Sequence, residues 1–151
     1  MANFVYNYFR KALLVGSFNL NSLPTVRVLL ATNSYAPDID NDSYRGHITG
    51  TEEVSGTNYT AGGVNLSSPN VQQDNTGNQG ILYGTAILWT PITAASIQYA
   101  VLYGSSGLGA ASDPLICALD LGTDPASGNF WSVTAGTFQV SFDAGGILAV
   151  T

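Results

Sequence analysis

Four apolar segments of nine or ten residues in the second half of the chain constrain the fold most. Each is rich in β-branched, aliphatic or aromatic residues, and the connectors between them are rich in Gly, Ser, Pro and Asp, which is typical of β-strands. In the last of the four, Phe138, Val140 and Phe142 alternate with polar residues and predict a strand with one buried face. The segments are GILYGTAILW (80–89), ASIQYAVLYG (95–104), PLICALDLG (114–122) and GTFQVSFDA (136–144), and a shorter one, GILAVT (146–151), follows them.

The first half of the chain has a different pattern. Residues 4–15 place apolar side chains at intervals of three and four, which predicts one short amphipathic helix. From Thr25, the run TVRVLLATNSY predicts the first strand. Residues 36–80 are rich in Asp, Asn, Ser, Thr and Gly, so we expect long loops there. The apolar helix positions are Val5, Phe9, Ala12 and Leu13, and short strands are expected near Glu53–Val54 and Gly63–Leu66.

Several short strands, one helix and no alternation of strands with helices predict a mainly β fold. We expect an antiparallel β-sandwich or a jelly-roll-like flattened barrel. A chain of 151 residues fits one domain, so residues 1–151 are interpreted as a single β-sandwich domain in which residues 1–20 form an N-terminal helix and arm.

The composition favours a surface that meets other proteins. Charged residues make up 9 % of the chain, against about 25 % in an ordinary globular domain. Uncharged Ser, Thr, Asn, Gln, Gly and Tyr must therefore cover the surface, and they are buried at an interface at less desolvation cost than Lys or Glu.

The charge balance argues against polyanionic partners. Four cations oppose ten carboxylates, giving a net charge of −6, so we expect neither nucleic acid nor an anionic membrane as partner. No apolar stretch approaches the roughly 20 residues that span a bilayer, and the N-terminus lacks the order of a signal peptide, so we expect synthesis in the cytoplasm.

Motifs for catalysis are missing from the sequence. There is no phosphate-binding GxxxxGK run and no GxSxG turn to pair with His47, the sole histidine. One His and one Cys do not make a zinc site, and Cys117 lies in an apolar run that predicts a buried thiol. We therefore expect a protein that is not an enzyme and needs no cofactor.

The acidic run PDIDND is the one metal-like motif. Asp38, Asp40 and Asp42 alternate like the start of a calcium loop, but Ser43 and Thr49 stand where that loop needs Gly and Glu. Two interpretations stay open: a solvated acidic loop, and a looser calcium site. The looser site would use Glu52 or Glu53, and a glycosidase-like carboxylate pair could be drawn from Glu52, Glu53, Asp120 and Asp143.

Aromatic residues are the candidates for contact with partners, because they dominate interface anchors as well as cores. Some lie in the N-terminal arm and others in the polar loops. The competing interpretation is that the arm is an ordinary amphipathic helix packed on its own sandwich. The candidate contact residues are Phe4, Tyr6, Tyr8, Phe9, Tyr35, Tyr44 and Tyr59.

Two stretches carry a family resemblance. VRVLLATNSYAPDID followed by EEVSGTNYTAGG, within Thr25–Gly63, resembles a family of small structural proteins of tailed bacteriophages, and the closing FDAGGILAVT is similar to that family's end. The glycines of these motifs, Gly62, Gly63, Gly145 and Gly146, are expected to supply positive φ at turns.

The resemblance implies a virion component. The favoured role is a capsid decoration (cement) protein on the outer surface of the head, which binds the major capsid protein where capsomers meet and forms a homotrimer on local three-fold axes. One alternative is a tail or head-fibre component that binds host-surface glycan through a Tyr or Trp platform. Another is a carbohydrate-active enzyme that uses a carboxylate pair.

Overall fold

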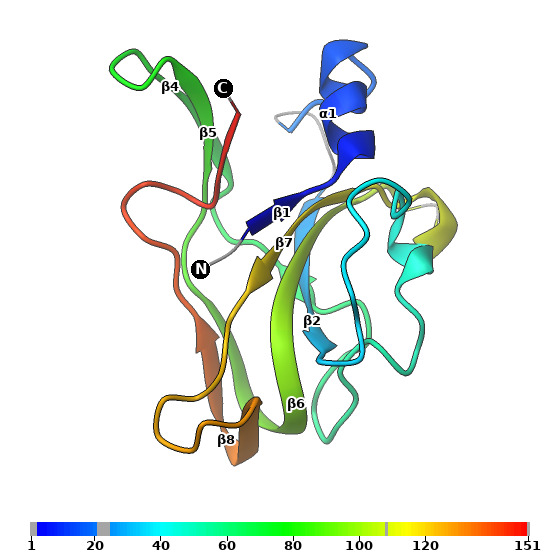
Figure 1. Cartoon of the computed structure of the whole chain (residues 1–151), viewed down its shortest axis with the longest axis vertical. Helices are drawn as coiled ribbons and strands as arrows, with labels where there is room; N and C mark the ends of the chain where they lie inside the picture. Colours follow the sequence, from blue (N-terminus) through cyan, green and yellow to red (C-terminus); the bar gives the residue numbers. More distant parts are fainter. Residues whose placement is uncertain (1–2, 21–24, 108, 151) are drawn as a thin grey trace.

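The fold was analysed in a computed structural model that describes residues 3–20, 25–107 and 109–150. Strands dominate it, with one short α-helix near the N-terminus and two single-turn 3-10 helices among these residues (Figure 1). The elements are β1 (Asn3–Val5), α1 (Asn7–Leu14), β2 (Thr25–Thr32), η1 (Arg45–His47), β3 (Val64–Asn65), β4 (Asn70–Asp74), β5 (Gln79–Tyr83), β6 (Ile87–Ser105), η2 (Ala110–Ser112), β7 (Leu115–Asp120), β8 (Trp131–Val140) and β9 (Leu148–Val150).

Two antiparallel sheets make up the fold. The larger has the strand order β1-β7-β6-β2-β3, with β8 also paired to β6, and the smaller has the order β4-β5-β9. All these strand pairs are antiparallel. The mainly β, antiparallel sandwich expected from the sequence is confirmed.

Strand β6 organises the larger sheet. It is 19 residues long and curves through the molecule, with its first half paired to β8 and its second half between β2 and β7 (Figure 1). The sequence suggested two separate strands at 80–89 and 95–104, and this division is wrong. The first segment breaks after Tyr83, and its second part continues through Pro91 into the next segment. Pairing with β8 shifts register around Pro91, so the proline's missing N–H disrupts no regular ladder there.

Other boundaries also differ from the sequence expectations. The N-terminal stretch begins as a strand, because Asn3–Val5 pairs with β7, and the helix is therefore limited to Asn7–Leu14. Strand β4 was not expected in its polar segment, whereas near Glu53 there is only a bridge to Ala31. The strand predicted at 136–144 is instead Trp131–Val140, so Phe142 lies beyond its end. Over Gly136–Val140 exposed positions alternate with half-buried or buried ones, as predicted. Residue 151 lies outside the described residues.

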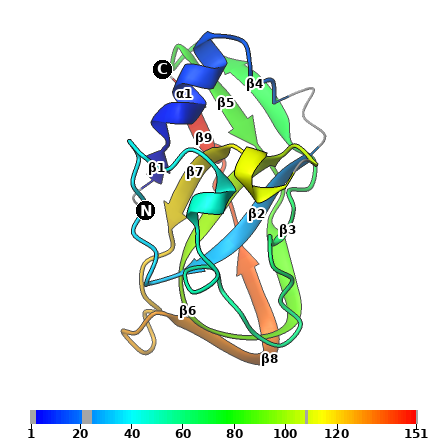
Figure 2. The same cartoon turned by 90° about the vertical axis from the view of Figure 1, so that its right-hand side faces the viewer.

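The core lies on both faces of the larger sheet, where it is formed by β2, β7 and the second half of β6. One face carries a cluster that includes Phe9 and Ala12 of α1 and Leu82 and Leu148 of the smaller sheet. The opposite face carries a second cluster, in which Tyr35 and Ile48 pack on the sheet from the connection between β2 and β3. This connection lies over the sheet face (Figure 2). The β2–β3 connection, which lies largely in the region of predicted long loops, therefore covers this part of the core.

Candidate functional site

Three of the predicted contact residues lie in the core, and for them the interface assignment is wrong. Tyr6 and Phe9 are 0 % exposed and Tyr35 is 3 % exposed. Phe9 packs its ring edge against Phe18 under α1. The Tyr6 hydroxyl lies 2.5 Å from the Tyr35 hydroxyl, and the latter donates to Asp42 Oδ2 at 2.9 Å. Burial raises the pKa of both tyrosines, because their ionised forms would lose solvation.

Two half-buried candidates hold the chain together. Phe4 meets Tyr99 edge to face, with 6.4 Å between ring centroids. The Tyr59 hydroxyl accepts a hydrogen bond from Leu30 N at 2.9 Å and donates to Glu53 Oε1 at 3.1 Å. Burial, followed by the nearby Glu53 carboxylate, raises the pKa of Tyr59. Tyr59 therefore fastens the β2–β3 connection to β2.

The structure brings the remaining two candidates together on the surface. Tyr8 of α1 and Tyr44 of the β2–β3 connection are half-buried, their ring centroids are 4.8 Å apart, and Tyr44 Oη donates to Tyr8 Oη at 2.7 Å. This hydrogen bond raises the pKa of Tyr44. The pair joins the arm to the polar loop, and because tyrosines are enriched among interface anchors, both residues stay candidates for contact with a partner.

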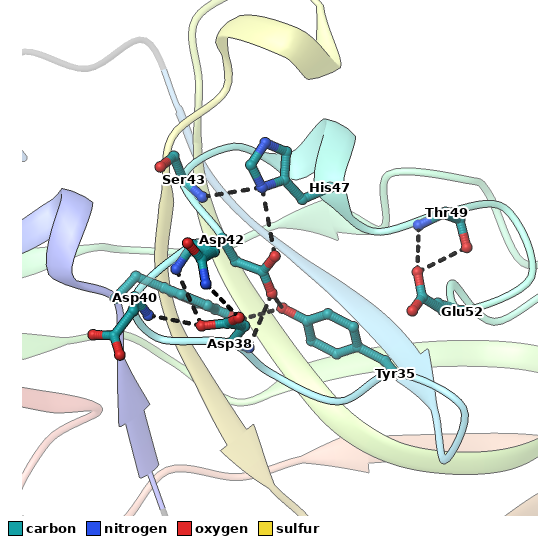
Figure 3. A network of polar contacts seen from close by, with 10 residues as sticks. Tyr35, Asp38, Asp40, Asp42, Ser43, His47, Thr49 and Glu52 are labelled. Carbon is teal, nitrogen blue, oxygen red and sulfur yellow. Dashed lines mark hydrogen bonds and ion pairs between the residues drawn. The ribbon is translucent and has the colours of Figure 1, made fainter.

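The acidic run is held by hydrogen bonds from its own chain (Figure 3). Asp38 Oδ1 accepts from the backbone N–H groups of Asp40 and Asn41, and Asp38 Oδ2 accepts from Asn41 Nδ2 at 2.8 Å. These donors lower the pKa of Asp38, with the Asn41 side chain contributing most. Asp42 Oδ2 accepts from Asp38 N as well as from Tyr35, so the run folds into a compact turn.

This acidic turn also positions the helix and the lone histidine. Asn7 at the start of α1 donates from its backbone N–H to Ile39 O and from its side chain to Asp40 Oδ1. His47 Nδ1 lies 3.5 Å from Asp42 Oδ1 and 3.4 Å from the N–H of Ser43 (Figure 3). His47 thus contributes to loop packing.

The carboxylates proposed for a calcium site are spread apart. Glu52 binds Thr49 at some distance from the acidic turn (Figure 3), and Glu53 accepts from Tyr59 and from Gly62 N. Across residues 3–20, 25–107 and 109–150, no three His, Cys, Asp or Glu side chains form a group that could hold a metal ion. Asp120 and Asp143, named for a glycosidase pair, each accept a hydrogen bond from a glycine two residues further on.

A groove along β8 is a feature that the sequence did not indicate. It has a volume of about 410 Å³, and its lining includes Trp131, Val133 and Phe138, with Asp124 and Gln139 as polar members. The two aromatic rings lie 6.2 Å apart at 67°, and the indole N–H of Trp131 donates to Leu121 O. The strand was predicted to begin at residue 136, so Trp131 was not expected to lie on the same strand as Phe138.

Exposed apolar side chains gather at the end of α1. Leu14 is 89 % exposed and Val15 is 65 % exposed. A groove of about 360 Å³ runs between Leu13, Leu14 and the strand β9, and Val150 at its far side is also exposed. The helical spacing that puts Phe9 and Ala12 inside leaves Leu14 outside, so this feature could have been found in the sequence.

Cys117 is fully buried in β7, as predicted, and burial raises the pKa of its thiol to about 12.

Comparisons of the chain with protein-family models, curated proteins and solved structures find no match. None of the described helices is long and apolar enough to span a membrane.

Proposed function

We propose that this chain is a virion structural protein of a tailed bacteriophage, acting as a decoration (cement) protein on the outer surface of the capsid. It works by binding the major capsid protein where capsomers meet and by associating with copies of itself as a trimer, without catalysing a reaction. The proposal is supported by the resemblance of the motifs in Thr25–Gly63 and of the last ten residues to this protein class.

The structural observation that carries the proposal is the surface around α1. Leu14, Val15 and the Tyr8–Tyr44 pair expose apolar and aromatic groups there, on a chain with 9 % charged residues. Exposed groups of this kind mark protein interaction sites, and aromatic residues with few charges are typical of interface centres. An acidic chain also suits the outside of the head, away from packaged DNA.

Light scattering behind size exclusion tests this function. The purified protein is run alone and then with emptied phage heads that lack it. We expect the protein to move to the elution volume of the heads, and the Tyr8→Ala, Tyr44→Ala double variant to move less. A folded protein that stays free at saturating concentration contradicts the cement role.

The groove along β8 favours a second candidate, saccharide binding in a tail or head fibre. Trp131 and Phe138 offer ring surface for the C–H face of a sugar, and Asp124 and Gln139 offer hydrogen-bonding groups for its hydroxyls. A glycan array followed by tryptophan fluorescence tests this candidate. Trp131→Phe should abolish the fluorescence change on glycan addition, because the remaining tryptophan, Trp89, is buried away from the groove. Phe130→Ala changes a residue outside the groove lining and should keep the fluorescence change. An array without hits excludes the candidate.

A further inference from the structure

Helix α1 carries the exposed cations among the described residues. Arg10 and Lys11 are exposed, and the structure describes no ion pair between either of them and a carboxylate among residues 3–20, 25–107 and 109–150. Arg10 donates to Asn7 Oδ1, whereas Arg27 donates to Gly63 O and Arg45 pairs with Asp113. Together with Leu14 and Val15, Arg10 and Lys11 form the α1 patch, an apolar surface flanked by positive charge.

A second surface has the opposite character. Ile39 is 36 % exposed and stands between the exposed carboxylates of Asp38 and Asp40. These three residues form the acidic tip. The bonds from Asn41 to Asp38, and those from Asn7 to Ile39 O and Asp40 Oδ1, fix its conformation. Binding would therefore cost little ordering entropy at this surface.

We propose that the α1 patch of one copy docks on the acidic tip of the next copy. Leu14 and Val15 would pack on Ile39, while Arg10 and Lys11 face Asp38 and Asp40. The two surfaces are complementary in charge as well as in apolar character. Positive groups flank the apolar residues of the α1 patch, and carboxylates flank the apolar residue of the acidic tip. Complementary charge of this kind selects partner and orientation.

The two surfaces adjoin on one chain, because Arg10 Nη1 donates to Asn7 Oδ1 at 3.1 Å and Asn7 Nδ2 donates to Asp40 Oδ1 at 2.6 Å. Asn7 is the first residue of α1, and the α1 patch follows it along the helix from Arg10 to Val15. Docking of the patch of one copy on the tip of another gives either a two-fold pair, in which both patches and both tips are used, or a head-to-tail ring, and the measured mass distinguishes two copies from three or more. The number of three copies rests on the proposed function, whereas the docking rests on the two surfaces.

Charge reversal tests the contact in the full-length protein. By light scattering across a concentration series, we expect the wild type to have the mass of an oligomer at low salt and to dissociate as salt rises. Lys11→Glu should shift the mass toward one copy, and Asp40→Lys should do the same. The Lys11→Glu, Asp40→Lys double variant should recover the oligomer, because each contact again joins opposite charges.

Leu14→Ser tests the apolar part and has a matched control. Leu14 is exposed, so the variant should fold as the wild type does but lose the oligomer. Leu88→Ser changes a leucine that is 51 % exposed on β6 and should leave the mass unchanged. Circular dichroism and thermal unfolding check that every variant is folded.

The proposal is overturned by a wild type that has the mass of one copy at every concentration, by single variants with unchanged mass, or by a double variant that fails to recover. Binding to emptied heads is measured separately. A protein that binds heads as a single copy would refute this contact and keep the proposed function. An oligomer that does not bind heads would support this contact and refute the proposed function.

Discussion

At position 63 the backbone conformation and its close contacts require glycine. Its φ is +65°, and a Cβ placed there would lie 1.9 Å from the Val28 carbonyl oxygen and 2.6 Å from Leu29 Cα. The close approach lets the β2–β3 connection lie against β2. Gly62 and Gly146 also have the positive φ expected from the sequence, whereas Gly145 does not: its N–H instead donates to Asp143 Oδ1.

Gly63→Ala should lower the free energy of unfolding by more than about 3 kcal/mol, because both backbone strain and a steric clash oppose the methyl group. Gly107→Ala is the matched control. Gly107 has φ +75° but open space around a Cβ, so about 1 kcal/mol is expected there. Urea unfolding measures both, and equal losses would show that the close approach is not tight.

The buried tyrosines make stability sensitive to alkaline pH. Burial raises the pKa of Tyr6, Tyr35 and Tyr59, whereas an unfolded tyrosine ionises near pH 10. Above that pH the unfolded chain releases protons that the folded chain keeps, so the free energy of unfolding should fall as pH rises beyond about 10. Denaturant unfolding at pH 8 to 11 should show a flat region followed by a decline.

Tyr35→Phe isolates the contribution of Tyr35 to this pH dependence. It removes the hydroxyl that joins Tyr6 to Asp42, so we expect a loss of about 1–2 kcal/mol at neutral pH, together with a shallower decline above about pH 10. Denaturant unfolding of variant and wild type, side by side, measures both effects. An unchanged alkaline slope would mean that Tyr35 ionises in the folded protein.

Among the elements, the two halves of β6 differ in environment. Its second half is covered on both faces, since Ala100 and Leu102 pack in one cluster and Tyr99, Val101 and Tyr103 in the other. The first half alternates between buried and exposed positions. We expect hydrogen exchange to be slowest at amides 99–103 and much faster in the exposed strand β4, as mass spectrometry of peptide fragments can resolve.

The N-terminal arm behaves as part of the core. Strand β1 pairs with β7, and Tyr6 and Phe9 are buried, so deleting residues 2–9 should unfold the protein and not merely release it from a capsid. Loss of the cooperative thermal transition is the expected result. Tyr8→Ala keeps the buried side chains and should remain folded. A folded deletion variant would restore the interpretation of the arm as a free contact segment.

For the whole molecule, the single-domain assignment of residues 1–151 stays a prediction. The larger cluster joins Leu82 and Leu148 of the smaller sheet to Val28 and Leu102 of the larger one, which favours unfolding in one step. Calorimetry should give one transition, with calorimetric and van't Hoff enthalpies in agreement. The Leu14→Ser variant suits this measurement if it removes self-association, and two separate transitions would contradict the assignment.

The sequence by itself determined the fold class, the β2 strand, the short helix, the alternation in β8 and the burial of Cys117. These follow from local patterns of apolar residues, which the pleat of a strand or the turn of a helix imposes wherever the chain packs. Only the tertiary structure decided that β6 is continuous through Pro91, because register against β8 settles whether a proline is tolerated. It also decided that Tyr6 and Tyr35 are core and that Tyr8 and Tyr44 meet on the surface. Pairs 29 or 36 residues apart in the chain depend on how the β2–β3 connection lies over the sheet, and no local pattern encodes that.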